Sequence, residues 1–304
     1  MRPSEDILDL YKKKICNVAK AFDAFCTKHD LRYFAIGGTA IGALRHKGII
    51  PWDDDIDFVM PRPDYERFIQ IATELLPDYD IFSYQSNKEY HSVITKMCDA
   101  NTSLVIDPRV HSVVGAFIDI FPLDGCLGET IGEREEFFYD TKQVRLDAEN
   151  LRKHYFFRDL LSSINRKQFD EIRDQLKSHW YHLTNKPSNP FERYEEIISN
   201  TSYEDSEYVT YFGTHYDAKN ISRREWYDDY FYAPFEDFQI RLPKGIHEYL
   251  TQMFRDYMTP PPPEKRIALH SFFFLNLEKR VSWEEARSEM KKAGNNIFSR
   301  LWGN

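Results

Sequence analysis

The residues most able to do chemistry lie between positions 36 and 60, in the segment IGGTAIGALRHKGIIPWDDDIDFVM. Its acidic end places four aspartates within five positions, and one residue separates Asp55 from Asp57. On a β-strand these two side chains would point to the same side, while Ile56 and Phe58 would enter a core. Carboxylates suit hard cations such as Mg²⁺ or Mn²⁺, so the spacing predicts a metal-binding pair.

A glycine pair, Gly37-Gly38, precedes the acids. Because glycine has no Cβ atom, this turn could bring backbone N–H groups against a phosphate, and a helix opening at Thr39 would add a favourable dipole. Taken alone, such a dipeptide is more often a tight turn, and an acidic run is more often a solvated loop. Four acids inside an apolar frame would repel one another unless a cation bound there. The combination therefore favours one joint metal and phosphate site, suited to phosphoryl displacement.

Composition argues against several classes of protein. The 304 residues carry a formal net charge of −9, which argues against nucleic-acid binding through a basic surface. No stretch approaches the roughly 20 apolar residues of a membrane helix, and the N-terminal MRPSEDILDLYKKK has no apolar region for secretion. We therefore expect a cytoplasmic protein. The four cysteines form no CxxC or His-paired motif, which predicts buried free thiols.

Hydrophobic periodicity predicts the elements that would position the site. Helical spacing indicates helices over residues 4–29, 65–76 and 244–257. Apolar runs indicate strands over residues 33–36, 79–84, 91–98 and 116–121, and a strand or hairpin over 231–242. This order predicts an α/β (α+β) fold, with one mixed β-sheet and helices packed on it.

The chain divides into three expected parts. Residues 1–128 would form the catalytic core, residues 129–228 a helical insertion or lobe, and residues 229–304 a C-terminal part that completes the core. Within the insertion, residues 154–180 mix basic and aromatic side chains. They could touch a membrane surface or an anionic acceptor, although a solvated helix face is the commoner outcome for mixed charge.

Four segments resemble the LicD family, a relative of the fukutin-type proteins within the nucleotidyltransferase superfamily. They are GGTAIGALRHKGIIPWDDDIDFVMPRPDYERF (37–68), ITKMCDANTSL (94–104), AFIDIFPLDG (116–125) and LPKGIHEYLTQMFRDYMTPPPPEKR (242–266). The resemblance covers most of residues 30–125 and 235–270, in the family's order. It implies a nucleotidyltransferase-like fold whose site combines a Gly-Gly or Gly-Ser turn, an Asp-x-Asp strand and an acid from a third strand.

Asp119 is the candidate for that third acid, because it lies between Ile118 and Ile120 in an apolar run. From local sequence alone, it could equally cap the turn at Pro122, since aspartate favours turns. The resemblance favours a carboxylate that reaches the same cations from a neighbouring strand. Asp124 is the weaker candidate.

The resemblance also implies residues that bind a donor. The turn Gly37–Thr39 would bind phosphate oxygens, and Arg45, Lys47 and Lys96 could contact the donor, although exposed basic residues are commonly just solvated. If the donor carries a quaternary ammonium group, Trp52 could form part of an aromatic cage. A tryptophan packed in the core is the alternative.

LicD enzymes pass the phosphoalcohol group of a CDP-activated alcohol, most typically CDP-choline, to a hydroxyl of a cell-surface glycan or its lipid-linked precursor, and they release CMP. The resemblance thus implies a phosphorylcholine transferase-like enzyme in which Asp55, Asp57 and Asp119 hold Mg²⁺ on the diphosphate. Asp119 would also accept the acceptor's proton. Peripheral association with the inner face of the membrane would suit a lipid-linked acceptor.

Three alternatives stay open at this point. A nucleotidyltransferase acting on a small molecule would use the same residues and leave pyrophosphate. A related transferase would move a polyol phosphate or sugar phosphate from another nucleotide-diphosphate donor. A non-catalytic scaffold would be favoured by a missing acid, and here all three are present.

Overall fold

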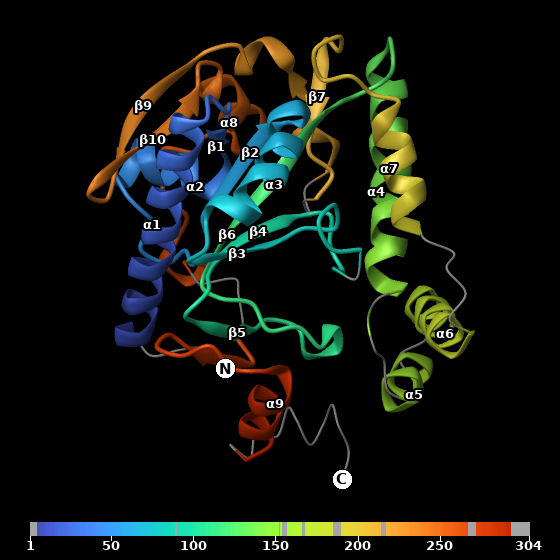
Figure 1. The fold of residues 1–304 in the computed structure, drawn as a ribbon. Helices are drawn as coiled ribbons and strands as arrows, with labels where there is room; N and C mark the ends of the chain where they lie inside the picture. Colours follow the sequence, from blue (N-terminus) through green and yellow to red (C-terminus); the bar gives the residue numbers. More distant parts are fainter. Residues whose placement is uncertain are drawn as a thin grey trace.

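The centre of the fold is a mixed β-sheet with helices packed on it (Figure 1). The computed structural model describes residues 5–88, 90–151, 153, 157–165, 168–184, 190–213, 217–266 and 272–292. The main path of the sheet has the order β1-β2-β6-β4-β3, and its strands are β1 (Phe34–Ala35), β2 (Asp57–Pro61), β6 (Phe117–Gly125), β4 (Thr95–Asp99) and β3 (Tyr79–Phe82). Strands β2 and β6 run parallel, whereas β1–β2, β6–β4 and β4–β3 are antiparallel. The predicted mixed α/β architecture is therefore confirmed.

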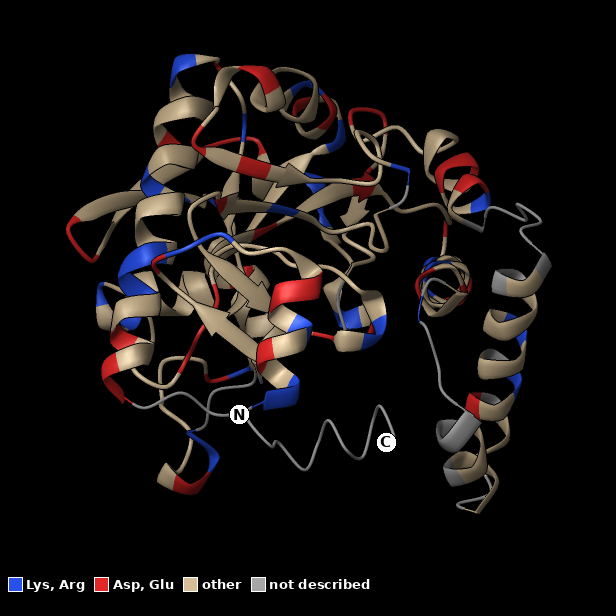
Figure 2. Cartoon of the chain, turned by 60° about the horizontal axis from the view of Figure 1, so that its bottom comes forward, with Lys and Arg blue, Asp and Glu red and all other residues tan. Residues whose placement is uncertain are grey.

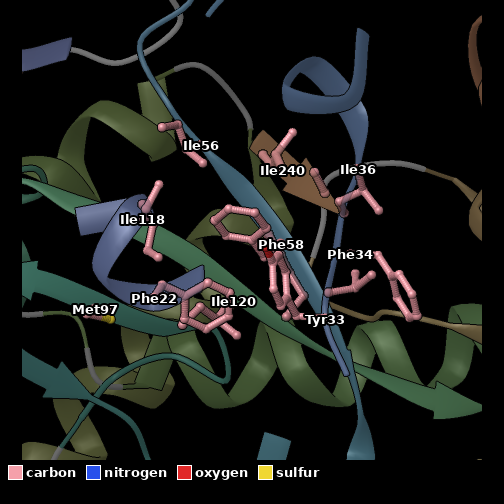
Figure 3. Packing of buried hydrophobic residues seen from close by; sticks show 14 of the residues in the cluster. Phe22, Tyr33, Phe34, Ile36, Ile56, Phe58, Met97, Ile118, Ile120 and Ile240 are labelled. Atoms are coloured by element: carbon pink, nitrogen blue, oxygen red, sulfur yellow. The ribbon is translucent and has the colours of Figure 1, made fainter. Parts of the chain in front are cut away.

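Helices α1 (Glu5–Lys28) and α3 (Arg62–Leu75) pack on this sheet, close to where the sequence predicts them (Figure 1). The helix α1 contributes Phe22 to a core of three aromatic rings. The Phe22 ring lies 4.9 Å from that of Phe58 on β2 and 4.9 Å from that of Tyr33, which directly precedes β1 (Figure 3). All three side chains are fully buried, and burying one large apolar side chain contributes about 1.5–3 kcal/mol. This packing fixes the start of the chain to the strands that carry the acidic run.

A short helical segment follows β1 and precedes the acids. It consists of α2 (Gly37–Ile41) and a π-helical turn (Gly42–His46), and Lys47 ends it in a left-handed conformation with φ of 60°. The backbone N–H of Glu236 donates to the Lys47 carbonyl, and the Glu236 carboxylate accepts a hydrogen bond from the N–H of Ile49. Glu236 lies at the turn of the hairpin formed by β9 (Tyr230–Phe235) and β10 (Phe238–Pro243). The C-terminal part of the chain thus holds the loop that leads into the acidic run.

The helices after residue 128 form a group beside the sheet (Figures 1 and 2). They are α4 (Ile131–Leu151), α5 (Phe157–Asn165), α6 (Phe169–Thr184) and α7 (Pro190–Ser199). A second apolar cluster, which includes Phe138, Phe191 and Phe212, joins α4 and α7 to the chain near β7. Strand β7 (Tyr208–Thr210) returns to pair with the end of β6. The predicted insertion therefore contains a helical portion and a portion that rejoins the sheet.

The remaining elements are short. They are β5 (Ser103–Val105), β8 (Ser222–Arg223), β11 (Phe274–Asn276), α8 (Ile246–Phe254), α9 (Trp283–Lys292) and 3-10 turns at Pro108–Val110, Ala218–Asn220, Arg224–Tyr227 and Pro263–Lys265. Acidic and basic side chains are interspersed over these elements and the longer helices (Figure 2). Within the described ranges, the helices lack an apolar stretch of the length that a bilayer crossing requires. Part of the basic and aromatic stretch 154–180 lies outside the described residues.

A buried ion pair fastens α3 to β6. Arg62 donates two hydrogen bonds to Asp124, from Nε to Oδ1 at 2.6 Å and from Nη2 to Oδ2 at 2.7 Å. The Asp124 side chain is fully buried and that of Arg62 is 12% exposed. Removing one partner of a buried pair leaves the other charge without compensation. Asp124, the weaker candidate for a third site acid, is therefore committed to this structural pair.

We expect Asp124→Ala to lower the free energy of unfolding by about 3–5 kcal/mol, because it leaves the Arg62 guanidinium buried and unpaired. Urea denaturation followed by circular dichroism measures this change. The control is Asp229→Ala, which removes the solvent-exposed pair with Lys244 and should leave the unfolding midpoint almost unchanged. Equal, small effects of both substitutions would contradict the structural role of Asp124.

Candidate active site

The parallel pairing of β2 and β6 brings two acids together. Asp57, the first residue of β2, lies directly across from Asp119 on β6. On the other side of β6, Asp119 is opposite Lys96 of β4, and Lys96 Nζ lies 2.5 Å from Asp119 Oδ1. The flanking Ile118 and Ile120 are fully buried. The structure thus places Asp119 beside Asp57, as the sequence predicts, and adds Lys96 as its ion-pair partner.

Asp55 is not part of the strand, contrary to the prediction. The ladder with β6 begins at Asp57, so residues 53–56 form an extended approach that precedes the regular strand. Burial nevertheless alternates as in a strand, because Asp54 and Ile56 are buried while Asp55 and Asp57 are partly exposed. The Ile56 carbonyl accepts a hydrogen bond from the Asp119 N–H at 2.9 Å. The i, i+2 relation between Asp55 and Asp57 is therefore retained, although the regular strand starts two residues later than expected.

A tight group of carboxylates precedes the strand. One oxygen from each of Asp53, Asp54 and Asp55 lies within 4.8 Å of the others. Of these three acids only Asp55 was predicted as a site residue, although the density of aspartates in the run also indicated Asp53 and Asp54. Oxygen-only groups of this kind fit Mg²⁺ or Mn²⁺.

Neighbouring negative charges act strongly on Asp57. Burial raises the pKa of Asp57 well above its ordinary value of 3.8, and the negative charges of Asp55, Asp119 and Asp53 raise it further. The Lys96 ammonium acts in the opposite direction and lowers it. A carboxyl group surrounded by other acids loses its proton readily only when further positive charge is present. The residues present therefore fit a divalent cation.

The glycine turn lies against these acids. The helix begins at Gly37 and not at Thr39 as predicted, and Gly37 has a φ of +54°, which strains any residue with a Cβ atom. A Cβ atom on Gly38 would lie 2.5 Å from Asp53 Oδ2, so the missing side chain makes room for that carboxylate. The buried Thr39 hydroxyl accepts a hydrogen bond from the Asp57 N–H at 2.8 Å. Thr39 therefore positions the first residue of β2.

A pocket opens beside Lys96. Its lining residues are His91, Lys96, Ile106, Asp107, Val110, Ser112, Val114 and Phe117. The Lys96 ammonium lies 3.7 Å from the centre of the Phe117 ring, and Phe117 and Asp119 share one face of β6 because they are two residues apart. Lys96 therefore forms a boundary between the pocket and the acids.

The remaining predicted ligands lie further along the helical segment. Arg45 Nη1 donates to the Tyr257 carbonyl at 2.6 Å, and Lys47 is exposed at the end of the π-helical turn. The Trp52 ring, predicted as part of an ammonium cage, already faces the guanidinium of Arg266 at 5.0 Å and the His46 ring at 5.7 Å. Trp52 is also one of the partly buried side chains that pack against the main hydrophobic core, which is the alternative that the sequence left open.

Comparison with known proteins assigns a class to this arrangement. Residues 30–157 match the family described as LicD/FKTN/FKRP, nucleotidyltransferase domain. The lipopolysaccharide cholinephosphotransferase LicD of Haemophilus influenzae is 29% identical over 260 residues, which cover 84% of this chain and 92% of that protein. The two matches support a phosphotransferase enzyme of LicD type. Residues 30–157 match the LicD family model, and the resemblance found in the sequence is confirmed.

Two further relatives match shorter stretches. An uncharacterised protein of Rickettsia prowazekii is 36% identical over 73 residues, which are 26% of its length. An uncharacterised protein of Rickettsia typhi is 41% identical over 66 residues, which are 20% of its length. These matches add no activity to the comparison.

Replacing Asp57 by asparagine should stabilise the metal-free protein. Because the pKa of Asp57 in the folded state lies above 3.8, the folded state binds more protons than the unfolded state above that pH. The carboxylate therefore lowers the free energy of unfolding as the pH rises through this window. We expect the gain from Asp57→Asn to be larger at pH 8 than at pH 4, measured by urea denaturation with EDTA present.

The control for this experiment is Asp229→Asn. Hydrogen bonding to Lys244 lowers the pKa of Asp229, so its carboxylate has the opposite linkage to folding and its removal should not stabilise. A loss of stability in Asp57→Asn that is the same at both pH values would show that Asp57 acts as a structural residue.

Proposed function

We propose that this protein transfers phosphocholine from CDP-choline to a hydroxyl of lipopolysaccharide or a related cell-surface glycan, in a reaction that depends on Mg²⁺ or Mn²⁺ and releases CMP. The name of the Haemophilus influenzae relative supports the choline-phosphate group and the lipopolysaccharide acceptor, and the CDP-linked donor is what the family resemblance implies. The observation that carries the proposal to this chain is the register of the strands, which sets Asp57 beside Asp119 and pairs Asp119 with Lys96.

The proposed roles follow from where the residues lie. Asp55, Asp57 and Asp119, together with the adjacent Asp53 and Asp54, would hold the cation. When bound, the cation would neutralise charge on the donor's diphosphate. Phosphoryl transfer needs mainly positioning and neutralisation of charge, so little further covalent chemistry is asked of the protein.

The protein's own groups then orient the reacting atoms. The backbone of Gly37, Gly38 and Thr39 would donate hydrogen bonds to phosphate oxygens, as helix N-termini do. The Lys96 ammonium would contact an oxygen of the transferred phosphoryl group from the side of the pocket. The acceptor oxygen forms a bond to the choline-bearing phosphorus while the bond from that phosphorus to CMP breaks. Asp119 would take the proton from the acceptor hydroxyl.

The released product distinguishes this proposal from its alternatives. Incubation of the full chain with CDP-choline, lipopolysaccharide and Mg²⁺ should yield CMP and choline-labelled lipopolysaccharide in equal amounts. A nucleotidyltransferase would instead release pyrophosphate from a nucleoside triphosphate. Transfer of another phosphoalcohol would appear as CMP or GMP from a polyol-linked or sugar-linked donor, with CDP-choline inert. Either of these two results would overturn the assignment of phosphocholine.

Substitution of the acids tests the metal site. We expect Asp55→Asn, Asp57→Asn and Asp119→Asn each to lower kcat by about 100-fold or more, because a cation contributes several kcal/mol of charge stabilisation. EDTA should abolish the wild-type rate, and Mg²⁺ or Mn²⁺ should restore it. Asp229→Asn is the matched control, since it removes an exposed aspartate far along the chain. Near-normal turnover in the Asp57 and Asp119 variants would refute this site.

Lys96 offers a second, independent test. We expect Lys96→Met to lower kcat by about 10-fold or more and Lys96→Arg to retain a larger share of activity, because the positive charge is what the phosphoryl oxygens require. Steady-state kinetics with CDP-choline as the varied substrate measures this. Lys14→Met is a suitable control, because Lys14 also pairs with an aspartate, Asp99, from outside the acidic group. If Lys96→Met and Lys14→Met behave alike, Lys96 has no role in transfer.

A further inference from the structure

A cluster of basic side chains lies next to the acidic group, and none of its members has a role in the proposed reaction. It consists of Arg45, His46 and Arg266 around the ring of Trp52, and we call it the basic cluster. Arg266 stacks over Trp52 at 5.0 Å, and His46 meets the same ring edge-on at 5.7 Å. Arg45 Nε lies 3.4 Å from His46 Nδ1. Residues from two distant parts of the sequence thus converge on one partly exposed indole.

The basic cluster has no acidic counterpart among the described residues. Arg45 and Arg266 each donate to a backbone carbonyl, of Tyr257 and Pro261 respectively, and neither takes part in an ion pair there. Burial lowers the pKa of Arg45, and the charge of Arg266 lowers it further. Burial also lowers the pKa of His46, and the charges of Arg45 and Arg266 lower it further. The two guanidinium groups repel each other, so an anion bound between them would be stabilised.

The position of the basic cluster limits which anion could bind there. Arg45 lies on the same helical segment as the Gly37-Gly38 turn. It follows Gly38 by seven residues, which corresponds to about 10 Å along a helix. Trp52 directly precedes Asp53 of the acidic group. The donor's diphosphate is assigned to the acids, so a second anionic group near the basic cluster belongs to the other substrate.

We propose that the basic cluster binds a phosphate group of the acceptor glycan, and that the enzyme therefore prefers phosphorylated acceptors. This inference rests on the proposed function only in identifying the bound molecule as the acceptor. The guanidinium groups of Arg45 and Arg266 supply paired N–H donors that match phosphate oxygens. Stacking on Trp52 holds the Arg266 guanidinium in place for this contact.

Direct binding tests the anion site without any turnover. Glucose 6-phosphate is the probe, glucose is its neutral counterpart, and the Trp52 indole N–H resonance, assigned with Trp52→Phe, is the readout. We expect glucose 6-phosphate to shift this resonance in the full-length wild type and glucose not to do so. Arg266→Gln should weaken binding about tenfold, as loss of a charge-assisted contact does. Lys265→Gln, which removes the neighbouring exposed charge, should bind as the wild type does.

A second arm separates the acceptor from the donor. Arg266→Gln should bind CDP-choline with Mg²⁺ within twofold of the wild type, measured by calorimetry, and should raise KM for lipopolysaccharide but not for its dephosphorylated form. Equal weakening of CDP-choline binding would make the basic cluster a donor site and overturn the proposal. Unchanged glucose 6-phosphate binding in Arg266→Gln would also overturn it. If the wild type releases no CMP from CDP-choline while the glucose 6-phosphate result holds, the proposed function fails and the anion site remains.

Discussion

The parallel pairing of β2 with β6 is the constraint on which the site depends. Neighbouring strands lie about 4.8 Å apart, so the register that aligns Asp57 with Asp119 forces two carboxylates together on one face. The same register continues through buried residues of both strands, such as Phe58 and Ile120. The acids cannot separate without a shift of the ladder, and such a shift would turn the apolar side chains out of the core. Apolar packing thus holds the repelling charges in place.

Other parts of the chain serve that arrangement. The Thr39 hydroxyl ties the helical segment to the N–H of Asp57, and the missing side chain of Gly38 makes room for Asp53. Lys96 supplies the nearest positive charge. Two acids on β6 have different roles because they lie next to different residues. Asp124 is fully buried against Arg62 and fastens a helix, whereas Asp119 lies beside Asp57 and pairs with Lys96.

The sequence predicted much of this, for identifiable reasons. Periodicity placed α1 and α3, because each buries one apolar face, and an apolar run placed the β9–β10 hairpin. Alternation around Asp119 predicted its direction correctly. The start of β2 was wrong because a strand begins where a partner exists, and the ladder with β6 begins only at Asp57. The ion pair of Lys96 depends on β4 lying next to β6, and the contact of Arg266 with Trp52 joins distant segments. Neither follows from local pattern.

The helical segment Gly37–His46 relates the two charged regions to each other. Its first turn touches the acids, and its last turn, which is π-helical, carries Arg45 and His46. π-Helical turns are uncommon and often occur at functional sites, since they redirect side chains that a regular helix would place elsewhere. If a cation-bound diphosphate lies at the acids and a second anionic group lies at the basic cluster, this segment would set the distance between them. Phosphoryl transfer depends on holding two substrates at a set distance and angle, so the length of this segment would determine which acceptors present their hydroxyl correctly.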